Sequence, residues 1–373
     1  MKSILIIMLI ITGLAYLSQQ YTLQHKSYNK FHWDIYLVLL LIFLILFAGL
    51  RTSYNDTGNY ASGFVNSETI RPFLSNRANL DILHNPLFYG FQALIRTFSN
   101  NSNVFFMICA IIVNFLNLKF IKTYTDTENF AFTMFLYVAL GTLMLTIAAQ
   151  KQTLAMSVLT LALSALFDKK YVKYYIIVFT AGLIHTYAWL FLFLPLMDCK
   201  PWSTRSFVLL LGTFFIMYTF QSTISTFVEV ADQIGKNIPV EEVFDGNQMN
   251  ILRVAVYSVV PLTALIFKGR INSNIDRKNS IFIQMSIISL MFMLMGTLNG
   301  ANMFGRCANY FEIGMICVLP WLVRQLFTKQ SVTIVLLIAS MCFTFFYIYD
   351  NQGFQNIYRR KGITQFISEI IHQ

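Results

Sequence analysis

The chain has 373 residues, of which 56% are hydrophobic, 12% are charged and five are cysteines, and its formal net charge is +10. Soluble domains carry about 25% charged residues, so this composition excludes a disulfide-rich secreted scaffold, a disordered chain and a nucleic-acid-binding domain. It predicts a polytopic membrane protein, whose excess of Lys and Arg is typical of cytoplasmic loops. No CxxC pair occurs and no Cys–His cluster has metal-ligand spacing, so we expect neither a metal site nor a bound cofactor.

Ten or eleven apolar segments follow one another along the chain, each near the length of about 20 residues that spans a bilayer as a helix. Only helices and closed barrels satisfy every backbone group in lipid, and the sequence shows no short alternating strands. The predicted fold is all-α, with about 10–12 transmembrane or re-entrant helices in a single integral-membrane domain of residues 1–373. The segments are 3–18, 34–50, 102–122, 129–149, 151–167, 172–197, 204–224, 250–268, 280–298, 308–326 and 331–349.

The basic loops set the orientation, because Lys and Arg concentrate on the cytoplasmic side. Six basic clusters fall on one face only if segment 172–197 enters and leaves the membrane on the same side. A helix of that length would measure about 39 Å, which is long for one crossing. We therefore expect a re-entrant pair of half-helices with a break near Gly182 to His185, while a single tilted helix remains the alternative.

The extracytoplasmic face is then predicted to carry four features: a long loop with an interfacial helix over residues 51–101, the tight turn at Gln150-Lys151, a second loop over residues 225–249, and the stretch 299–307. Residues 354–373 are predicted to form an amphipathic C-terminal tail. Arg359, Arg360 and Lys361 also fall outside, against the distribution of basic residues elsewhere in the chain. The side of the C-terminus therefore stays open.

Arg51 opens the long outer loop and is followed by Asp56 and Tyr60. A guanidinium binds phosphate through two hydrogen bonds, a carboxylate can accept a hydroxyl proton, and a tyrosine ring offers a stacking face to a sugar. The alternative is an arginine that snorkels from a helix end beside an ordinary polar turn.

Lys151 and His185 interrupt apolar sequence on or near the same predicted side. Lys151, followed by Gln152, stands between two apolar segments with almost no loop, where a lone lysine is unexpected on the outer face. His185 has apolar neighbours on both sides, and an ionisable group at membrane depth is a functional candidate by default. A histidine that only packs in the protein interior is the alternative.

Arg306 lies in the stretch 299–309, where two glycines and three asparagines break the apolar pattern. Irregular backbone at membrane depth lines a cavity or is buried in protein. Arg306 and Tyr310 are four residues apart and so share a helical face, and Glu312 should be paired or protonated in the helix that follows. Arg51, Lys151 and Arg306 therefore favour a shared anionic ligand.

The chain as a whole resembles the EpsG family of exopolysaccharide polymerases, which are Wzy-like membrane glycosyltransferases. Three blocks in order carry the resemblance: Gly49-Leu50-Arg51 with Asp56 and Tyr60; Lys151-Gln152, an apolar helix, the basic turn 169–173 and His185; and Arg306 before Tyr310-Phe311. The chain departs from the family pattern at two of these positions: the family usually has Arg where Lys151 stands, and Gly where Asn55 precedes Asp56.

The resemblance implies a GT-C-like polymerase that needs no metal and works at the outer face of the cytoplasmic membrane. A growing glycan on undecaprenyl diphosphate or a similar polyprenyl carrier would be transferred to a second lipid-linked repeat unit. The donor, the acceptor and the bilayer are the implied partners, with a chain-length regulator and a flippase of the same pathway as further candidates. The implied catalytic residues are Arg51, Asp56, His185 and Arg306, with either His185 or Asp56 as the base; the implied substrate-binding residues are Tyr60, Lys151, Gln152 and Tyr310.

Other functions also agree with parts of the sequence. A flippase for the same lipids would share the basic residues, but transporters tend to show internal repeats, and the sequence has none. An O-antigen ligase or a membrane acyltransferase would also be a polytopic helical protein, and an acyltransferase should offer a catalytic His with a polar partner. A structural subunit would need none of the outer-face cations.

Overall fold

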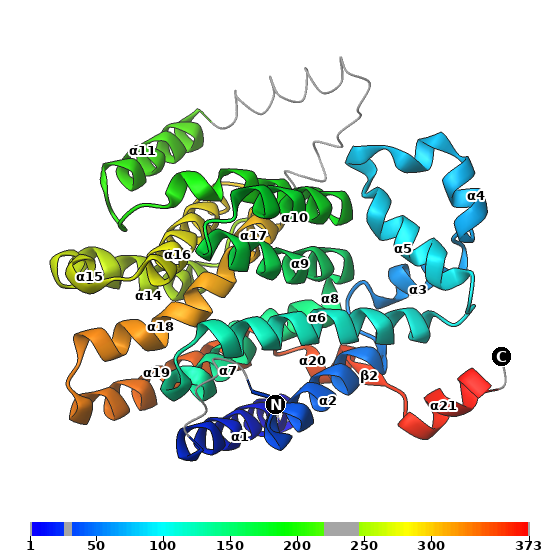
Figure 1. Ribbon diagram of the computed structural model, residues 1–373, viewed down its shortest axis with the longest axis horizontal. Helices are drawn as coiled ribbons and strands as arrows, with labels where there is room; N and C mark the ends of the chain where they lie inside the picture. The colour runs from blue at the N-terminus through cyan, green and yellow to red at the C-terminus, as the bar shows by residue number, and fades with distance from the viewer. Residues whose placement is uncertain (1, 26–31, 220–245, 372–373) are drawn as a thin grey trace. The chain divides into compact units, whose positions relative to one another are not determined.

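A computed structural model describes residues 2–25, 32–219 and 246–371. The chain forms two compact units, Met1–Leu192 with Lys329–Gln373, and Phe193–Thr328, and each is described by itself. Both are helical, and the described residues contain only two very short strands (Figure 1). The predicted all-α fold of a polytopic membrane protein is confirmed.

The first unit is built on long helices that pack side by side. Helix α6 packs against α2 and α9, α9 packs against α10, and α1 packs against α2 and α7, which in turn contacts α19. These helices are α1 (Lys2–Gln24), α2 (Ile35–Gly49), α6 (Ser102–Tyr124), α7 (Phe130–Ala139), α8 (Thr142–Ala148), α9 (Gln150–Phe167), α10 (Tyr171–Ile184) and α19 (Lys329–Asp350).

The second unit is centred on α16, which packs against α11, α14, α17 and α18. Its middle turns carry buried polar groups that are satisfied inside the unit: Gln284 donates to the carbonyl of Cys199 at 3.1 Å and to Ser206 Oγ at 2.8 Å. The helices are α11 (Thr204–Tyr218), α14 (Ile251–Ile266), α15 (Lys268–Asn274), α16 (Arg277–Met295), α17 (Ala301–Asn309) and α18 (Glu312–Leu326).

Every predicted apolar segment contains a helix, but only some of these helices are unbroken and long enough to span a membrane. In the described residues, four helices are long and apolar enough to cross, and up to six if two bent pairs each count as one span. The pair α7–α8 bends by 47° and the pair α14–α15 by 81°. Gly141, with φ of +91°, separates α7 from α8. Residues 225–245 of the predicted second outer loop lie outside the described residues.

Segment 172–197 breaks at His185, within the predicted range. Helix α10 ends at Ile184, and a 3-10 helix, η4 (Thr186–Met197), follows. The chain then turns back along α10, because Trp189 lies edge-on against Phe179 and the hydroxyl of Tyr174, at the start of α10, donates to the carbonyl of Phe191. This reversal favours the re-entrant pair over a single tilted helix.

Gly182 allows the close approach of η4 to α10. A Cβ atom at this position would lie 2.5 Å from the ring of Trp189, which no side chain could occupy without moving the indole. The glycine therefore permits the contact between Trp189 of η4 and helix α10.

The long loop 51–101 folds into short helices that lie together at one end of α6 (Figure 1). Strand β1 (Arg51–Ser53) leads into them, and α5 packs against α3, α4 and α10. The elements are α3 (Thr57–Val65), α4 (Ile70–Ser75), the 3-10 helices η1 (Arg77–Leu80) and η2 (Ile82–His84), and α5 (Pro86–Arg96).

The C-terminal tail returns to the start of this loop. It comprises α20 (Phe354–Ile357), strand β2 (Arg359–Arg360) and α21 (Ile363–Ile371). Strand β2 pairs antiparallel with β1, the backbone N–H of Lys361 donates to the carbonyl of Leu50 at 3.0 Å, and the hydroxyl of Tyr358 donates to the carbonyl of Phe47 at 2.8 Å. The tail therefore starts at the same end of the first unit as Arg51.

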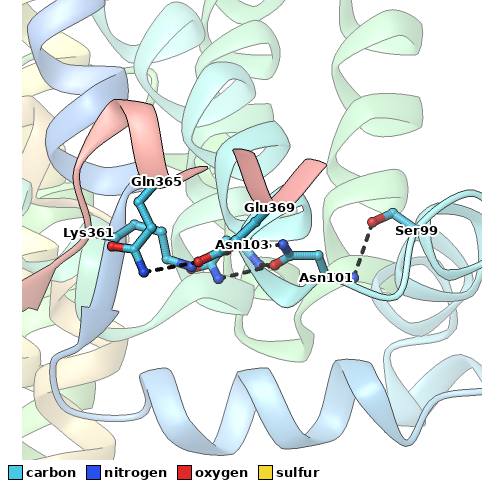
Figure 2. A network of polar contacts seen from close by, with 6 residues as sticks. All are labelled: Ser99, Asn101, Asn103, Lys361, Gln365 and Glu369. Carbon is cyan, nitrogen blue, oxygen red and sulfur yellow. Dashed lines mark hydrogen bonds and ion pairs between the residues drawn. The ribbon is translucent and has the colours of Figure 1, made fainter. Parts of the chain in front are cut away.

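A polar network then fastens α21 to the start of α6 (Figure 2). Lys361 Nζ lies 2.5 Å from Glu369 Oε2, and Asn101 and Gln365 also donate to this carboxylate. The hydrogen bond from Lys361 holds the pKa of Glu369 below its usual value. Apolar side chains of α21, among them Ile367 and Ile371, remain exposed, which suits a helix lying at a membrane surface.

Candidate active site at the start of helix α9

The first turn of α9 is where three of the eight predicted site residues, Arg51, Tyr60 and Lys151, are brought together. Ala149, with φ of −120° and ψ of 73°, separates α8 from α9, which begins at Gln150. The first N–H groups of a helix have no partner within the helix and carry a partial positive charge. One of them, the N–H of Lys151, lies 3.4 Å from the hydroxyl of Tyr60 on α3.

The side chain of Lys151 rests among aromatic rings. Its ammonium nitrogen lies 3.3 Å from the hydroxyl of Tyr89 and 5.0 and 5.5 Å from the ring centroids of Tyr89 and Phe88 on α5. Such cation–π contacts hold a charge without neutralising it. No carboxylate of the described residues pairs with this lysine, so its charge is available to an anionic ligand.

Arg51 is buried behind this surface, with 1% of its side chain exposed. The guanidinium donates to the side-chain oxygen of Gln150 and, at 2.7 Å, to the carbonyl of Ala48, and it lies 4.4 Å above the ring of Phe106. Burial lowers the pKa of Arg51 to about 10, so the group remains charged at neutral pH. In this conformation Arg51 holds the first residue of α9 and thereby positions Lys151, the next one.

His185 lies at the same end of the first unit because it directly follows α10, which packs against α9 and α5. Its ring is half-buried and lies edge-on to Tyr187, with centroids 5.1 Å apart. The N–H of the next residue, Thr186, donates to the side-chain oxygen of Asn85 at 3.1 Å. Since Asn85 directly precedes α5, which carries Tyr89, both His185 and Lys151 are tied to α5.

Asp56 and Gln152 are placed differently from each other. Asp56 is half-buried directly before α3, and its carboxylate makes no capping hydrogen bond to that helix. Gln152 is buried, and its amide nitrogen lies 3.8 Å from the sulfur of Met156 within α9. Gln150, two residues earlier, is the residue of α9 that contacts Arg51, and the predicted substrate-binding role of Gln152 stays a prediction.

Two further arginines lie beside Arg51, and sequence reasoning did not include them in the site. In the β1–β2 pair, Arg360 stands opposite Arg51 and Arg359 opposite Ser53, and both side chains are exposed. The sequence pointed to these two arginines only because they fell on the predicted extracytoplasmic side, where basic residues are unexpected.

Arg306 and Tyr310 belong to the second unit. Arg306 is exposed on α17, which starts after Gly300 at φ of +70°, while Tyr310 is buried at the end of that helix. Glu312 is buried and accepts a hydrogen bond from the hydroxyl of Tyr257 at 2.8 Å, as its position in an apolar helix required. The first unit alone thus joins Arg51, Tyr60 and Lys151, and it carries Asp56 and His185 at the same end.

The sequence model of the EpsG family matches residues 34–361. The chain belongs to the EpsG family. The matched range contains all eight predicted site residues together with Arg359 and Arg360. No curated protein and no solved structure matches the chain.

Membership of the EpsG family indicates an exopolysaccharide polymerase-like role of the glycosyltransferase kind in a membrane. For this EpsG-family chain, the start of α9 offers the means to bind a phosphate: a cation with no carboxylate partner in the described part of the chain, a helix N-terminus and aromatic rings. Within the described ranges, no three side chains of His, Cys, Asp or Glu gather as metal ligands would.

Arg51→Met is expected to lower both the thermal stability and the turnover of this EpsG-family protein. The substitution removes the donor to the buried oxygen of Gln150, and an unsatisfied buried polar group costs about 1–3 kcal/mol. If Arg51 acts through Gln150, the double variant Arg51→Met/Gln150→Leu should lose much less than the sum of the two single losses. This double-mutant cycle compares the turnover and the melting temperature of the wild type, the two single variants and the double variant. Additive losses in turnover would show that Arg51 acts independently of Gln150.

Proposed function

We propose that this protein joins oligosaccharide repeat units carried on polyprenyl diphosphate at the outer face of the cytoplasmic membrane. The family supports the polymerase class. The observation that carries the proposal is the placement of Lys151 at the start of α9, with its charge held by Tyr89 and Phe88 and no acidic partner among the described residues.

The proposed reaction is a single displacement of polyprenyl diphosphate by a sugar hydroxyl. The hydroxyl oxygen of the acceptor repeat unit forms a bond with the anomeric carbon of the donor glycan, the bond from that carbon to the diphosphate oxygen breaks, and the hydroxyl proton passes to a base. Negative charge develops on the leaving oxygen, so fixed positive charge at the diphosphate stabilises the transition state.

Lys151 is proposed as the diphosphate ligand, and Arg51 as the residue that positions it through Gln150. The exposed side chains of Arg359 and Arg360 are proposed as additional cations near the diphosphate or the negatively charged headgroups around it, because β2 lies directly beside β1. The predicted roles of Arg306 and Tyr310, on the second unit, stay predictions.

His185 is proposed as the base, with Asp56 as the competing candidate. His185 stands at the break of the re-entrant segment and is tied through Thr186 and Asn85 to the helix that contacts Lys151. Asp56 directly precedes the helix that carries Tyr60. Tyr60 and Tyr89 offer rings and hydroxyl groups to a sugar.

Purified protein supplied with a lipid-linked repeat unit tests the proposal. The expected products are a ladder of glycans on the lipid and a matching amount of released polyprenyl diphosphate. A flippase would move the lipid-linked unit across a proteoliposome bilayer without lengthening it, and this result would refute the polymerase assignment. A ligase would transfer one glycan to a different acceptor and give no ladder.

A further inference from the structure

A large apolar cavity lies beside the start of α9, within the first unit. It has a volume of about 770 Å³ and lies between the loop elements α4, η1, η2 and α5 on one side and α6, α9 and α10 on the other. This size is in the range of small-molecule sites, about 300–1,000 Å³. Every residue that lines it is apolar, so it suits a hydrocarbon and not a sugar. We call it the apolar groove.

The wall formed by α9 leads directly from Lys151. Leu154 and Val158 line the apolar groove, and they follow Lys151 by three and seven residues. Residues at these spacings share one face of a helix. Lys151 therefore lies on the same face of α9, about 10 Å along the helix from Val158. The apolar wall ends at Lys151.

The wall formed by α5 is a second apolar stripe beside the lysine. Leu87, Gly90 and Leu94 line the groove and recur at a spacing of three or four residues, so they share a face of α5. Leu87 and Leu94 are 42% and 45% exposed, which leaves apolar surface uncovered. Tyr89, next to Gly90, contacts Lys151.

The wall formed by α10 ends at His185, the proposed base. Phe179, Leu183 and Ile184 line the groove, and Ile184 is the last residue of α10 before His185. The stripes on α9 and α10 therefore stop beside Lys151 and His185, and the stripe on α5 runs beside Tyr89, which contacts Lys151. A single ligand lying in the groove would present its polar end to all three.

We propose that the apolar groove binds the first isoprenoid units of the polyprenyl chain, with the attached diphosphate at Lys151. An apolar tail with an anionic head matches an apolar groove that ends at a cation with no carboxylate partner among the described residues. This inference rests on the proposed function and adds to it the place where the lipid carrier is held. The groove fixes the chain so that the bond to be broken lies between Lys151 and His185.

Photo-crosslinking locates the chain directly. Purified protein in lipid nanodiscs is irradiated with a polyprenyl diphosphate that bears a diazirine in its first isoprene units. We expect crosslinks in peptides of α5, α9 and α10 that line the groove, with excess unlabelled polyprenyl diphosphate suppressing them and phosphatidylglycerol failing to do so. Equal suppression by phosphatidylglycerol would identify the occupant as an ordinary membrane lipid, and crosslinks elsewhere would place the chain outside the groove.

A pair of tryptophan variants tests the same point by affinity. Val158→Trp fills the groove, whereas Leu39→Trp adds the same side chain at a position that is 45% exposed, on α2, which does not line the groove. Because each methylene excluded from apolar contact weakens binding by severalfold, affinity for polyprenyl diphosphate should fall by about ten-fold or more in Val158→Trp and stay within about two-fold in Leu39→Trp. Unchanged affinity in a folded Val158→Trp protein would overturn the proposal.

The outcome separates this inference from the proposed function. If wild-type protein polymerises lipid-linked units but neither crosslinks in the groove nor responds to Val158→Trp, the groove assignment fails and the polymerase assignment stands. If the chain binds in the groove but wild-type protein gives no glycan ladder, the groove assignment stands and the polymerase assignment fails.

Discussion

Lys151→Met is expected to lower the rate of polymer synthesis by about ten- to a hundred-fold or more, since each charge-assisted hydrogen bond to phosphate contributes about 1.5–3 kcal/mol. Methionine keeps an apolar stem of similar length against Phe88 and Tyr89 and removes only the charge. The loss should therefore appear in turnover and leave the melting temperature nearly unchanged. Synthesis by the purified variant, measured against lipid-linked repeat unit, gives the rate.

Two matched variants complete this test. Lys151→Arg keeps the charge and should retain most of the activity, because the phosphate contact is preserved. Lys173→Met removes an exposed lysine from the first turn of α10, away from the start of α9, and should leave synthesis unchanged. Full activity in a folded Lys151→Met protein would exclude Lys151 from the site.

His185→Gln is expected to cause the second large loss, about 10²- to 10⁴-fold, which is the contribution of a general base. Glutamine keeps a polar side chain at the break between α10 and η4 but does not titrate. A base must be unprotonated to accept the hydroxyl proton, so the wild-type rate should rise with pH along a limb that depends on His185. This rising limb should be missing in the variant.

The pH profile also separates catalysis from packing. A histidine that only packs against Tyr187 would leave the rising limb in place when replaced and would lower the amount of folded protein instead. The parallel variant Asp56→Asn tests the competing base. If His185→Gln keeps both the rate and the limb while Asp56→Asn loses them, Asp56 is the base.

The all-α membrane fold could be predicted from composition because apolar runs of near-spanning length leave few other structures in lipid. The break at His185 could also be predicted, from the length of segment 172–197 and the positions of the basic turns. The bend at Gly141 was missed, because it depends on backbone conformation inside continuous apolar sequence, which a count of apolar residues does not detect. The bend between α14 and α15 lies where the predicted segment 250–268 ends and the basic sequence of α15 begins.

The site could be predicted in part, because charged residues in apolar surroundings are conspicuous wherever they lie. Arg51, Lys151 and Arg306 were expected to share one site; the first unit joins Arg51 and Lys151 through Gln150, and the place of Arg306 in the site stays a prediction. Gln150, Tyr89, Arg359 and Arg360 were not placed in the site, because their roles follow from contacts with residues far away in the sequence. Arg360, which pairs in β2 with a strand more than 300 residues earlier, shows why sequence spacing alone could not find it.

Two-sided cysteine labelling tests the central claim, that the end of the first unit carrying Lys151 faces out of the cell. Thr52 is exposed in β1 next to Arg51, and Lys173 is exposed at the far end of the α9–α10 pair, with α9 measuring about 27 Å between the two ends. Single cysteines are placed at these positions in a cysteine-free chain that still makes polymer, and intact cells are treated with a membrane-impermeant maleimide. We predict that Thr52→Cys is labelled in intact cells and that Lys173→Cys is labelled only after permeabilisation. Labelling of both from outside, or of Lys173→Cys alone, would contradict the account.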